Sequence, residues 1–201
     1  MPRRLNITLA VKRLVRDAAR RLPELAHVRA AHLLVVAGEA RRASRATISP
    51  AAEDRSGLRR HAIRIRGREI RYVVTLRPLW FVRSSPEERI DTILHELWHA
   101  SSRFDGRLDR GRRHDRLPAA RYGRLVRGMR ERYVAAAPPE VLAPFAHHGL
   151  ARARMWLERP PARRGARAGP RVYTELQLFY GVVVMRTGRR AARPAGGAAG
   201  R

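Results

Sequence analysis

Cysteine is absent from the 201 residues of the chain. Its absence excludes disulfides, iron–sulfur clusters and thiolate zinc ribbons, so zinc would need His, Asp or Glu ligands. Long apolar runs are missing too, and none approaches the roughly 18 residues of a membrane-spanning helix. The first residues lack the apolar core and cleavage site of a secretory signal. We therefore expect a cytoplasmic protein that does not span a membrane.

Lysine and acidic residues are scarce. Lys12 is the only lysine among 44 basic residues, and only 17 acidic residues oppose them, giving a formal net charge of +27. Such a charge predicts attraction to nucleic acid or other polyanions that weakens steeply with salt. The arginines are scattered and few aromatic residues lie among them. Nonspecific binding is therefore expected, and sequence-specific recognition is not indicated.

The length and the hydrophobic content of 44% suit one domain with a sizeable core. We assign this domain to residues 1–185, with a mobile linker or loop at 160–170 and a disordered basic tail at 186–201. Residues 7–21 show a helical period, and residues 1–22 are arginine-rich and amphipathic, as transit peptides are. We interpret this segment as the first helix.

Later segments alternate between strand and helix patterns. We expect strands at 32–38 and, more weakly, 43–48, then strands around Gly67 between Ile63 and Leu76. A helix should contain Tyr122, Val126, Met129 and Tyr133, followed by broken helical pieces at 140–156 and a last strand-like segment at 171–185. This order predicts an α+β fold, with a small mixed sheet packed on helices.

The segment from Ser85 to His99 has the clearest helix pattern. Ser85 is a suitable N-cap, Pro86 suits the first helical position, and Glu88 stands at the capping-box position. Apolar residues then recur at helical spacing and form one buried arc: Ile90, Ile93, Leu94, Leu97 and Trp98. His95 and His99 lie on the opposite side and should face a cleft.

His95-Glu96-x-x-His99 has a spacing with direct chemical meaning. Two histidines four residues apart lie on one helix face, so both imidazoles can bind one metal ion. The carboxylate of Glu96 would then stand where it can take a proton from a metal-activated water. The alternative is a pair of surface histidines that interact with Asp91 and Glu96.

A catalytic zinc ion usually takes a third protein ligand and leaves one position for water. His114 is our preferred third ligand, because the chain between it and His99 is long enough to return to the metal. Asp105 is the alternative, and in another role it could cap a turn or orient a bound histidine. Glu131 and Glu140 are more remote candidates, whereas we expect His147 and His148 to be structural or surface residues.

His95-Glu-Leu-Trp-His99 followed by His114 resembles the SprT-like zinc metallopeptidases. Phe104-Asp105-Gly106 and Leu108 are closer to an uncharacterised, phage-type metallopeptidase group, and the resemblance covers roughly residues 72–114. It implies a zincin-like fold, Zn²⁺ held by the three histidines, and Glu96 as general base. Asp115 follows His114 where these proteins often have glycine. The cysteine ribbon that many of them carry is missing.

Two main functions follow as expectations. The first is a zinc metalloendopeptidase acting on protein or peptide substrates, with Tyr122 or an arginine as a further donor to the reacting carbonyl. Its substrate could lie along a sheet edge formed by residues 70–76. The second is a non-catalytic nucleic-acid-binding module with a structural metal. Metal-assisted hydrolysis of a bond other than a peptide is a third alternative.

Overall fold

A computed structural model describes residues 5–38, 44–51, 62–112, 114, 118–156, 172–173 and 179–186. The expected linker at 160–170 and residues 187–201 of the expected tail lie outside this described part. Residues 52–61 lie outside it as well. Within the described residues, no helix is long and apolar enough to cross a membrane.

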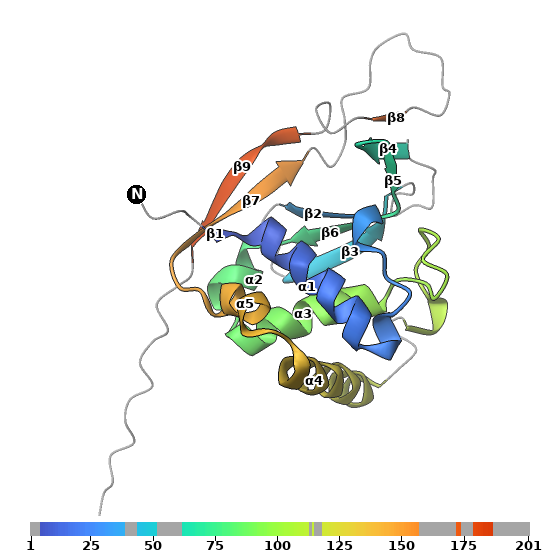
Figure 1. Cartoon of the computed structure of the whole chain (residues 1–201), viewed down its shortest axis with the longest axis vertical. Coiled ribbons are helices and arrows are strands. Elements are labelled where there is room, and N and C mark those ends of the chain that lie inside the picture. The colour runs from blue at the N-terminus through green and yellow to red at the C-terminus, as the bar shows by residue number, and fades with distance from the viewer. Residues whose placement is uncertain are drawn as a thin grey trace, which may run out of the picture.

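The fold mixes α-helices and β-strands (Figure 1). Its α-helices are α1 (Ile7–Arg21), α2 (Pro78–Arg83), α3 (Pro86–Trp98), α4 (Ala119–Ala136) and α5 (Pro139–Leu142). Short 3₁₀ turns are η1 (Pro23–Leu25), η2 (Ala30–His32), η3 (Arg110–Arg112) and η4 (Ala143–Ala146). The predicted bounds of α1, from residue 7 to 21, are confirmed. The expected mixture of α-helices and β-strands is observed.

The strands form a larger and a smaller sheet. They are β1 (Leu5–Asn6), β2 (Leu33–Ala37), β3 (Ala46–Pro50), β4 (Ala62–Ile65), β5 (Arg68–Ile70), β6 (Tyr72–Leu76), β7 (Leu150–Trp156), β8 (Val172–Tyr173) and β9 (Phe179–Arg186). The six-stranded sheet has the order β1-β7-β2-β6-β3, with β9 paired to β7, and the smaller sheet has the order β5-β4-β8. The expected strands around Gly67, which has φ of 74°, are confirmed, and β4 and β5 pair as an antiparallel hairpin.

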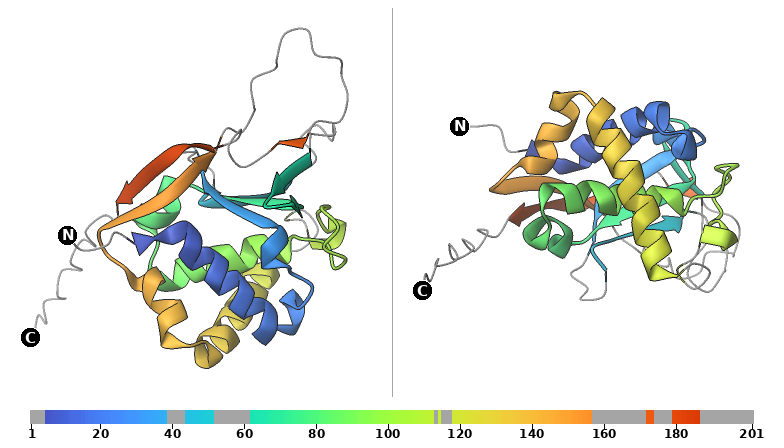
Figure 2. Two further views of the ribbon diagram at one scale, coloured as in Figure 1. Left: turned by 45° about the horizontal axis from the view of Figure 1, so that its top comes forward. Right: turned by 90° about the horizontal axis from the view of Figure 1, so that it is seen from below.

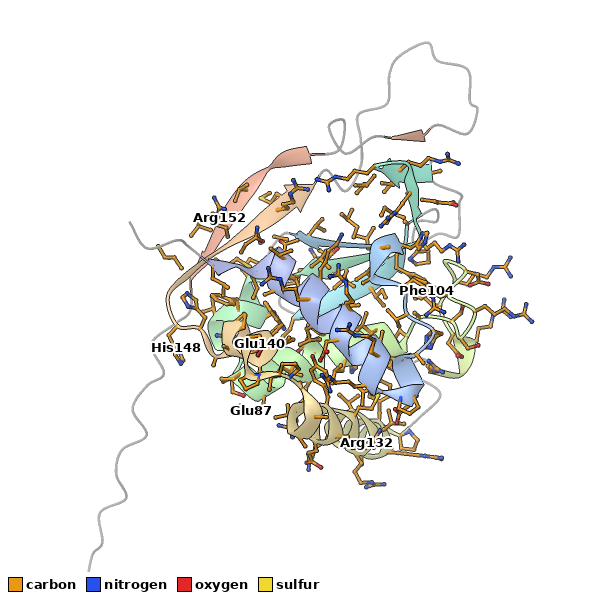
Figure 3. All side chains as sticks on the ribbon, viewed as in Figure 1. Glu87, Phe104, Arg132, Glu140, His148 and Arg152 are labelled. Atoms are coloured by element: carbon orange, nitrogen blue, oxygen red, sulfur yellow. The ribbon has the colours of Figure 1, made fainter. Side chains whose placement is uncertain are left out.

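The helical prediction for residues 150–156 is wrong, because this segment is the strand β7. Alanine and arginine favour helices intrinsically, which concealed the period of two in this segment. Ala151 and Ala153 are buried in the core, whereas Arg152 and Arg154 alternate with them and are exposed. Pairing with β1 and β9 decides the conformation against local propensity. Figure 3 labels Arg152 on this strand.

The core lies between the larger sheet and the helices α1, α3 and α4 (Figures 1 and 2). Strand β2 is buried on both faces, which explains its continuous apolar sequence. Leu33, Val35 and Ala37 join the main core, and Leu34 and Val36 face a smaller cluster that includes Ile70. In the right-hand view of Figure 2, α4 crosses over α3, and this crossing positions the site described next.

Candidate metal centre

The local sequence fixes the start of α3. Ser85 Oγ accepts a hydrogen bond from the Glu88 backbone N–H at 3.2 Å, and Glu88 accepts one from the Ser85 N–H at 2.8 Å. This reciprocal capping box confirms the predicted start of the helix. The helix ends at Trp98, and His99 is its C-cap residue in the right-handed helical region. The apolar arc is buried, so the rotation of α3 about its axis is also fixed.

Three histidine side chains converge beside α3. His95 Nε2 lies 3.3 Å from His114 Nε2 and 3.3 Å from His99 Nε2. The ligand atoms of the three residues all lie within 4.8 Å of one another. The structure therefore brings together the three residues that the sequence analysis selected as the preferred metal ligands.

These separations match the geometry of a zinc ion bound by histidines. Zn–N bonds of about 2.0–2.1 Å at tetrahedral angles place two nitrogen ligands roughly 3.3–3.4 Å apart. The two 3.3 Å separations have this value. A neutral imidazole has only one N–H, so three Nε2 atoms cannot all pair by hydrogen bonds among themselves. A cation at their centre would satisfy all three lone pairs at once.

The electrostatics of the cluster favour neutral imidazoles. Burial, with repulsion from His99 and His114 acting in the same direction, lowers the pKa of His95 to about 3. Burial and repulsion from His114 likewise lower the pKa of His99 to about 4. Both rings are therefore unprotonated at neutral pH, which is the form that binds metals.

A backbone contact orients the His99 ring on the side away from the other histidines. The Arg112 backbone accepts a hydrogen bond from the His99 ring, an interaction that opposes the lowering of the histidine pKa. Since His99 Nε2 faces His95 and Tyr122, this bond belongs to Nδ1. Such a carbonyl partner fixes the tautomer that leaves Nε2 free for a metal ion. The Arg112 side chain in turn bonds the Trp98 carbonyl at 3.0 Å and Asp109 at 3.2 Å.

Tyr122 reaches the cluster from α4. Its hydroxyl lies 3.1 Å from His99 Nε2, and its ring contacts the ring of His95 with a centroid separation of 4.7 Å. Burial, followed by the charge of Glu96, raises the pKa of the Tyr122 phenol. The phenol therefore keeps its proton and can donate a hydrogen bond at this position. The sequence alone does not distinguish Tyr122 from an arginine as the donor.

Glu96 is buried next to the histidines. One carboxylate oxygen accepts a hydrogen bond of 2.7 Å from the Ile48 N–H on β3. Burial raises the pKa of Glu96 to about 7, and the Ile48 hydrogen bond partly opposes this rise. A divalent cation at the adjacent imidazoles would favour the charged carboxylate. The Ile48 contact could not be predicted from the sequence, because any residue type can supply a backbone donor.

An open cleft of about 720 Å³ contains these groups. The three histidines, Glu96 and Tyr122 line it together with residues 44–48 at the start of β3. In the described sheet β3 is the last strand and pairs only with β6. The expected sheet edge at residues 70–76 is therefore wrong, because β6 pairs with β2 on one side and β3 on the other. The edge that faces the cleft is β3.

The other candidate ligands lie outside the histidine cluster. Asp105 is exposed and accepts hydrogen bonds from Ser101 Oγ at 2.6 Å and from the Arg107 N–H at 3.1 Å, which stabilise its turn. Neither Glu131 nor Glu140 joins a group of potential metal ligands in the described part of the chain. Figure 3 shows Glu140 and His148 beside α5, at the opposite side of the view from Phe104. His147 bonds the Leu150 carbonyl at 3.3 Å, as a structural residue would.

Comparisons with known proteins return no match: no family model, curated protein or solved structure is similar to the chain. The resemblance to SprT-like metallopeptidases therefore stays a prediction from the motif.

Proposed function

We propose that the chain is a zinc-dependent endopeptidase with a zincin-like fold. The observation that carries this proposal is the convergence of three imidazole Nε2 atoms, two pairs of them 3.3 Å apart, beside a buried glutamate. His95, His99 and His114 would hold the ion. No described carboxylate completes a four-ligand set, so a position remains for water or substrate.

Different residues of the chain would carry out different steps of peptide hydrolysis. When bound, zinc would supply Lewis acidity, activating a water and polarising the scissile carbonyl. The carboxylate of Glu96 accepts a proton from the attacking water and delivers it to the leaving amine. The Ile48 N–H holds this carboxylate in one orientation, so that its second oxygen remains available for proton transfer.

Tyr122 and β3 supply the remaining contacts. The protonated Tyr122 hydroxyl donates a hydrogen bond to the carbonyl oxygen as negative charge develops there. Because the Ile48 N–H points away from β6, the backbone groups of Ala46, two residues earlier, point the same way. An extended peptide can pair with this edge and pass over the histidines. Pairing through the backbone makes little demand on substrate sequence.

The proposal is tested by measuring metal content and proteolysis together. Purified wild-type protein should bind about one zinc ion and cleave an unfolded protein such as reduced casein. Glu96→Gln should keep the zinc and lose proteolysis by roughly 10²–10⁴-fold, since it removes only the proton acceptor. Equal proteolysis by wild type and Glu96→Gln, or zinc-loaded wild type that cleaves none of a varied set of substrates, would refute the proposal.

A second candidate function is supported by the net charge of +27. In this reading the arginine surface binds nucleic acid and the metal is structural. Binding of a DNA duplex, measured from 50 to 300 mM salt, should then weaken steeply as salt increases. Preserved DNA binding combined with a complete lack of proteolysis would favour this alternative. The two functions can also coexist, because the cleft and the bulk of the charge involve different residues.

A further inference from the structure

Beyond the histidines, the cleft continues between α3 and α4. Both helices contribute side chains to this groove: Asp91, Thr92 and His95 from α3, and Gly123, Val126 and Arg127 from α4. The two helices are held together by the Trp98–Tyr122 ring contact, at 5.2 Å between centroids, and by the Asp91–Arg130 ion pair at 3.2 Å. The groove thus has rigid walls and opens directly beside the metal ligand His95.

Gly123 leaves one wall of this groove open. It lies inside the 18-residue helix α4, where glycine costs roughly 1 kcal/mol relative to alanine. A Cβ atom added at Gly123 would meet no other atom within 4 Å, so close packing does not explain the glycine. The missing side chain instead keeps space free between Tyr122 and Arg127, which both line the cleft.

The carboxylates around the cleft already have partners. Glu88 lies 3.0 Å from Arg45, and both side chains are partly exposed. Asp109 lies 3.2 Å from Arg112. Asp91 is paired with Arg130, as described above, and Glu96 is bonded to a backbone N–H. These acidic groups are therefore compensated without Arg127.

Arg127 remains as a cation of the groove without a close acidic partner in the described part of the chain. Among the described residues it forms no ion pair within 4 Å, and its interaction with Asp91 acts only at longer range. It is exposed, lines the cleft, and follows Gly123 by one helical turn on the same face of α4. An anionic group that enters the open space at Gly123 would meet the Arg127 guanidinium.

Building on the proposed peptidase function, we infer that this groove receives an acidic substrate side chain within two residues of the scissile bond. Arg127 is its specificity-determining residue, and Gly123 provides the room. The substrate class is therefore an extended peptide segment that carries Asp or Glu beside the cleaved bond. A guanidinium suits this role because its planar donors can bond both oxygens of a carboxylate.

Binding is measured first, on zinc-loaded Glu96→Gln protein, so that cleavage does not interfere. The probes are fluorescein-labelled decapeptide mixtures without Asp or Glu, except for one central position that holds Glu, Gln or Lys. The Glu mixture should bind about 5-fold more tightly than the Gln mixture, as expected for a solvent-accessible ion pair. Arg127→Glu should reverse the preference towards Lys, and Gly123→Leu should reduce Glu binding to the level of Gln.

Arg124→Glu is the matched control. Arg124 is exposed on the same helix but does not line the cleft, and its substitution changes the net charge equally. This variant should keep the preference for Glu. Circular dichroism and zinc content confirm that each variant is folded and loaded. Equal binding of the Glu and Gln mixtures, or loss of the preference in Arg124→Glu as large as in Arg127→Glu, overturns the inference.

Cleavage separates this inference from the proposed function. Zinc-loaded wild type is incubated with a proteome-derived peptide mixture, and the cut sites are read by mass spectrometry. We expect Asp or Glu enriched about 5-fold at one position within two residues of the cut, and Lys or Arg enriched there with Arg127→Glu. Cleavage without acidic enrichment overturns the inference and leaves the peptidase proposal intact. Arg127-dependent binding of the Glu mixture without any cleavage supports binding of an acidic side chain in the groove and refutes the peptidase proposal.

Discussion

The polar side chains at the two ends of α3 differ in how fully they are hydrogen-bonded. Near the N-terminus, the guanidinium of Arg89 donates to the Phe81, Phe145 and His147 carbonyls at 2.7–3.0 Å and lies over the Phe81 ring. Near the C-terminus, three imidazole nitrogens face one another in an open cleft. In the first arrangement each carbonyl acceptor has an N–H donor. In the second, neutral imidazoles supply too few N–H groups to pair all three ring nitrogens.

This difference indicates that the N-terminal end of α3 stabilises the fold and that the C-terminal end is suited to binding a ligand. The Arg89 contacts connect α2, α3 and the end of η4 with the residue that follows it, so they stabilise the fold. The histidine cluster gains little from its own contacts, and under the proposed function a bound cation would complete it. The following substitutions should therefore separate folding from metal binding.

Removal of a histidine ligand should produce the largest effect on metal binding. His95→Ala or His114→Ala should weaken zinc affinity at least about 100-fold, because each removes one of three ligands. Asp105→Asn should leave zinc affinity unchanged, since this carboxylate stabilises a turn. Competition with a chromogenic chelator measures these affinities. Unchanged zinc binding by His114→Ala together with weakened binding by Asp105→Asn would reverse the assignment of the third ligand.

Removal of the Arg89 side chain should affect the other end of the helix. Arg89→Ala should lower the free energy of unfolding by about 2–4 kcal/mol, because it leaves several buried carbonyls without donors. Zinc stoichiometry should remain at the wild-type value. The exposed Arg83 is the control, and Arg83→Ala should change stability by less than about 0.5 kcal/mol. Urea denaturation measures both; a similar small loss for the two variants would contradict the stabilising role of Arg89.

Loss of the Tyr122 hydroxyl should affect catalysis without affecting the metal. Tyr122→Phe should lower kcat by about 100-fold, because it removes one donor to the developing oxyanion. Zinc affinity and KM should change little. Tyr133→Phe, at a buried tyrosine of the same helix that does not line the cleft, serves as the control. An equal loss of kcat in both variants would point to a general effect on α4 instead.

A change of pH should give the smallest and most selective effect. The lowered pKa values of His95 and His99, about 3 and 4, mean that the folded metal-free protein resists protonation that the unfolded chain accepts near pH 6.5. Their contribution to stability is thus present above pH 6.5 and is lost as the pH falls towards 4. The raised pKa of Glu96 acts in the opposite direction, so the measurement uses metal-free Glu96→Gln.

The midpoint temperature of thermal unfolding of that variant should decrease as the pH is lowered from 6.5 to 4. The further substitutions His95→Ala and His99→Ala should flatten this dependence, because they remove the groups that titrate. A pH dependence that is unchanged by both substitutions would assign the effect to groups elsewhere in the chain.

Local signals explain why much of the fold could be predicted. The capping box at Ser85 and Glu88, the apolar arc of α3 and the turn at Gly67 each involve residues close in sequence. The strand β7 was missed, because its Ala-Arg alternation satisfies helix propensity as well as strand burial. Sheet order was missed for a similar reason: no local feature distinguishes β6, which has partners on both sides, from the edge strand β3.

By itself, the sequence determined α3: a capped helix with two histidines and a glutamate on the side opposite its apolar arc. It also determined the excess of arginine and the lack of thiolate ligands. Only the tertiary structure decided that His114 returns to the pair while Asp105 stays in its turn, and that Tyr122, Arg127 and the β3 edge share one cleft. The physical reason is range. Capping and periodicity act within a few residues, whereas these contacts depend on the packing of α4 and the larger sheet around α3.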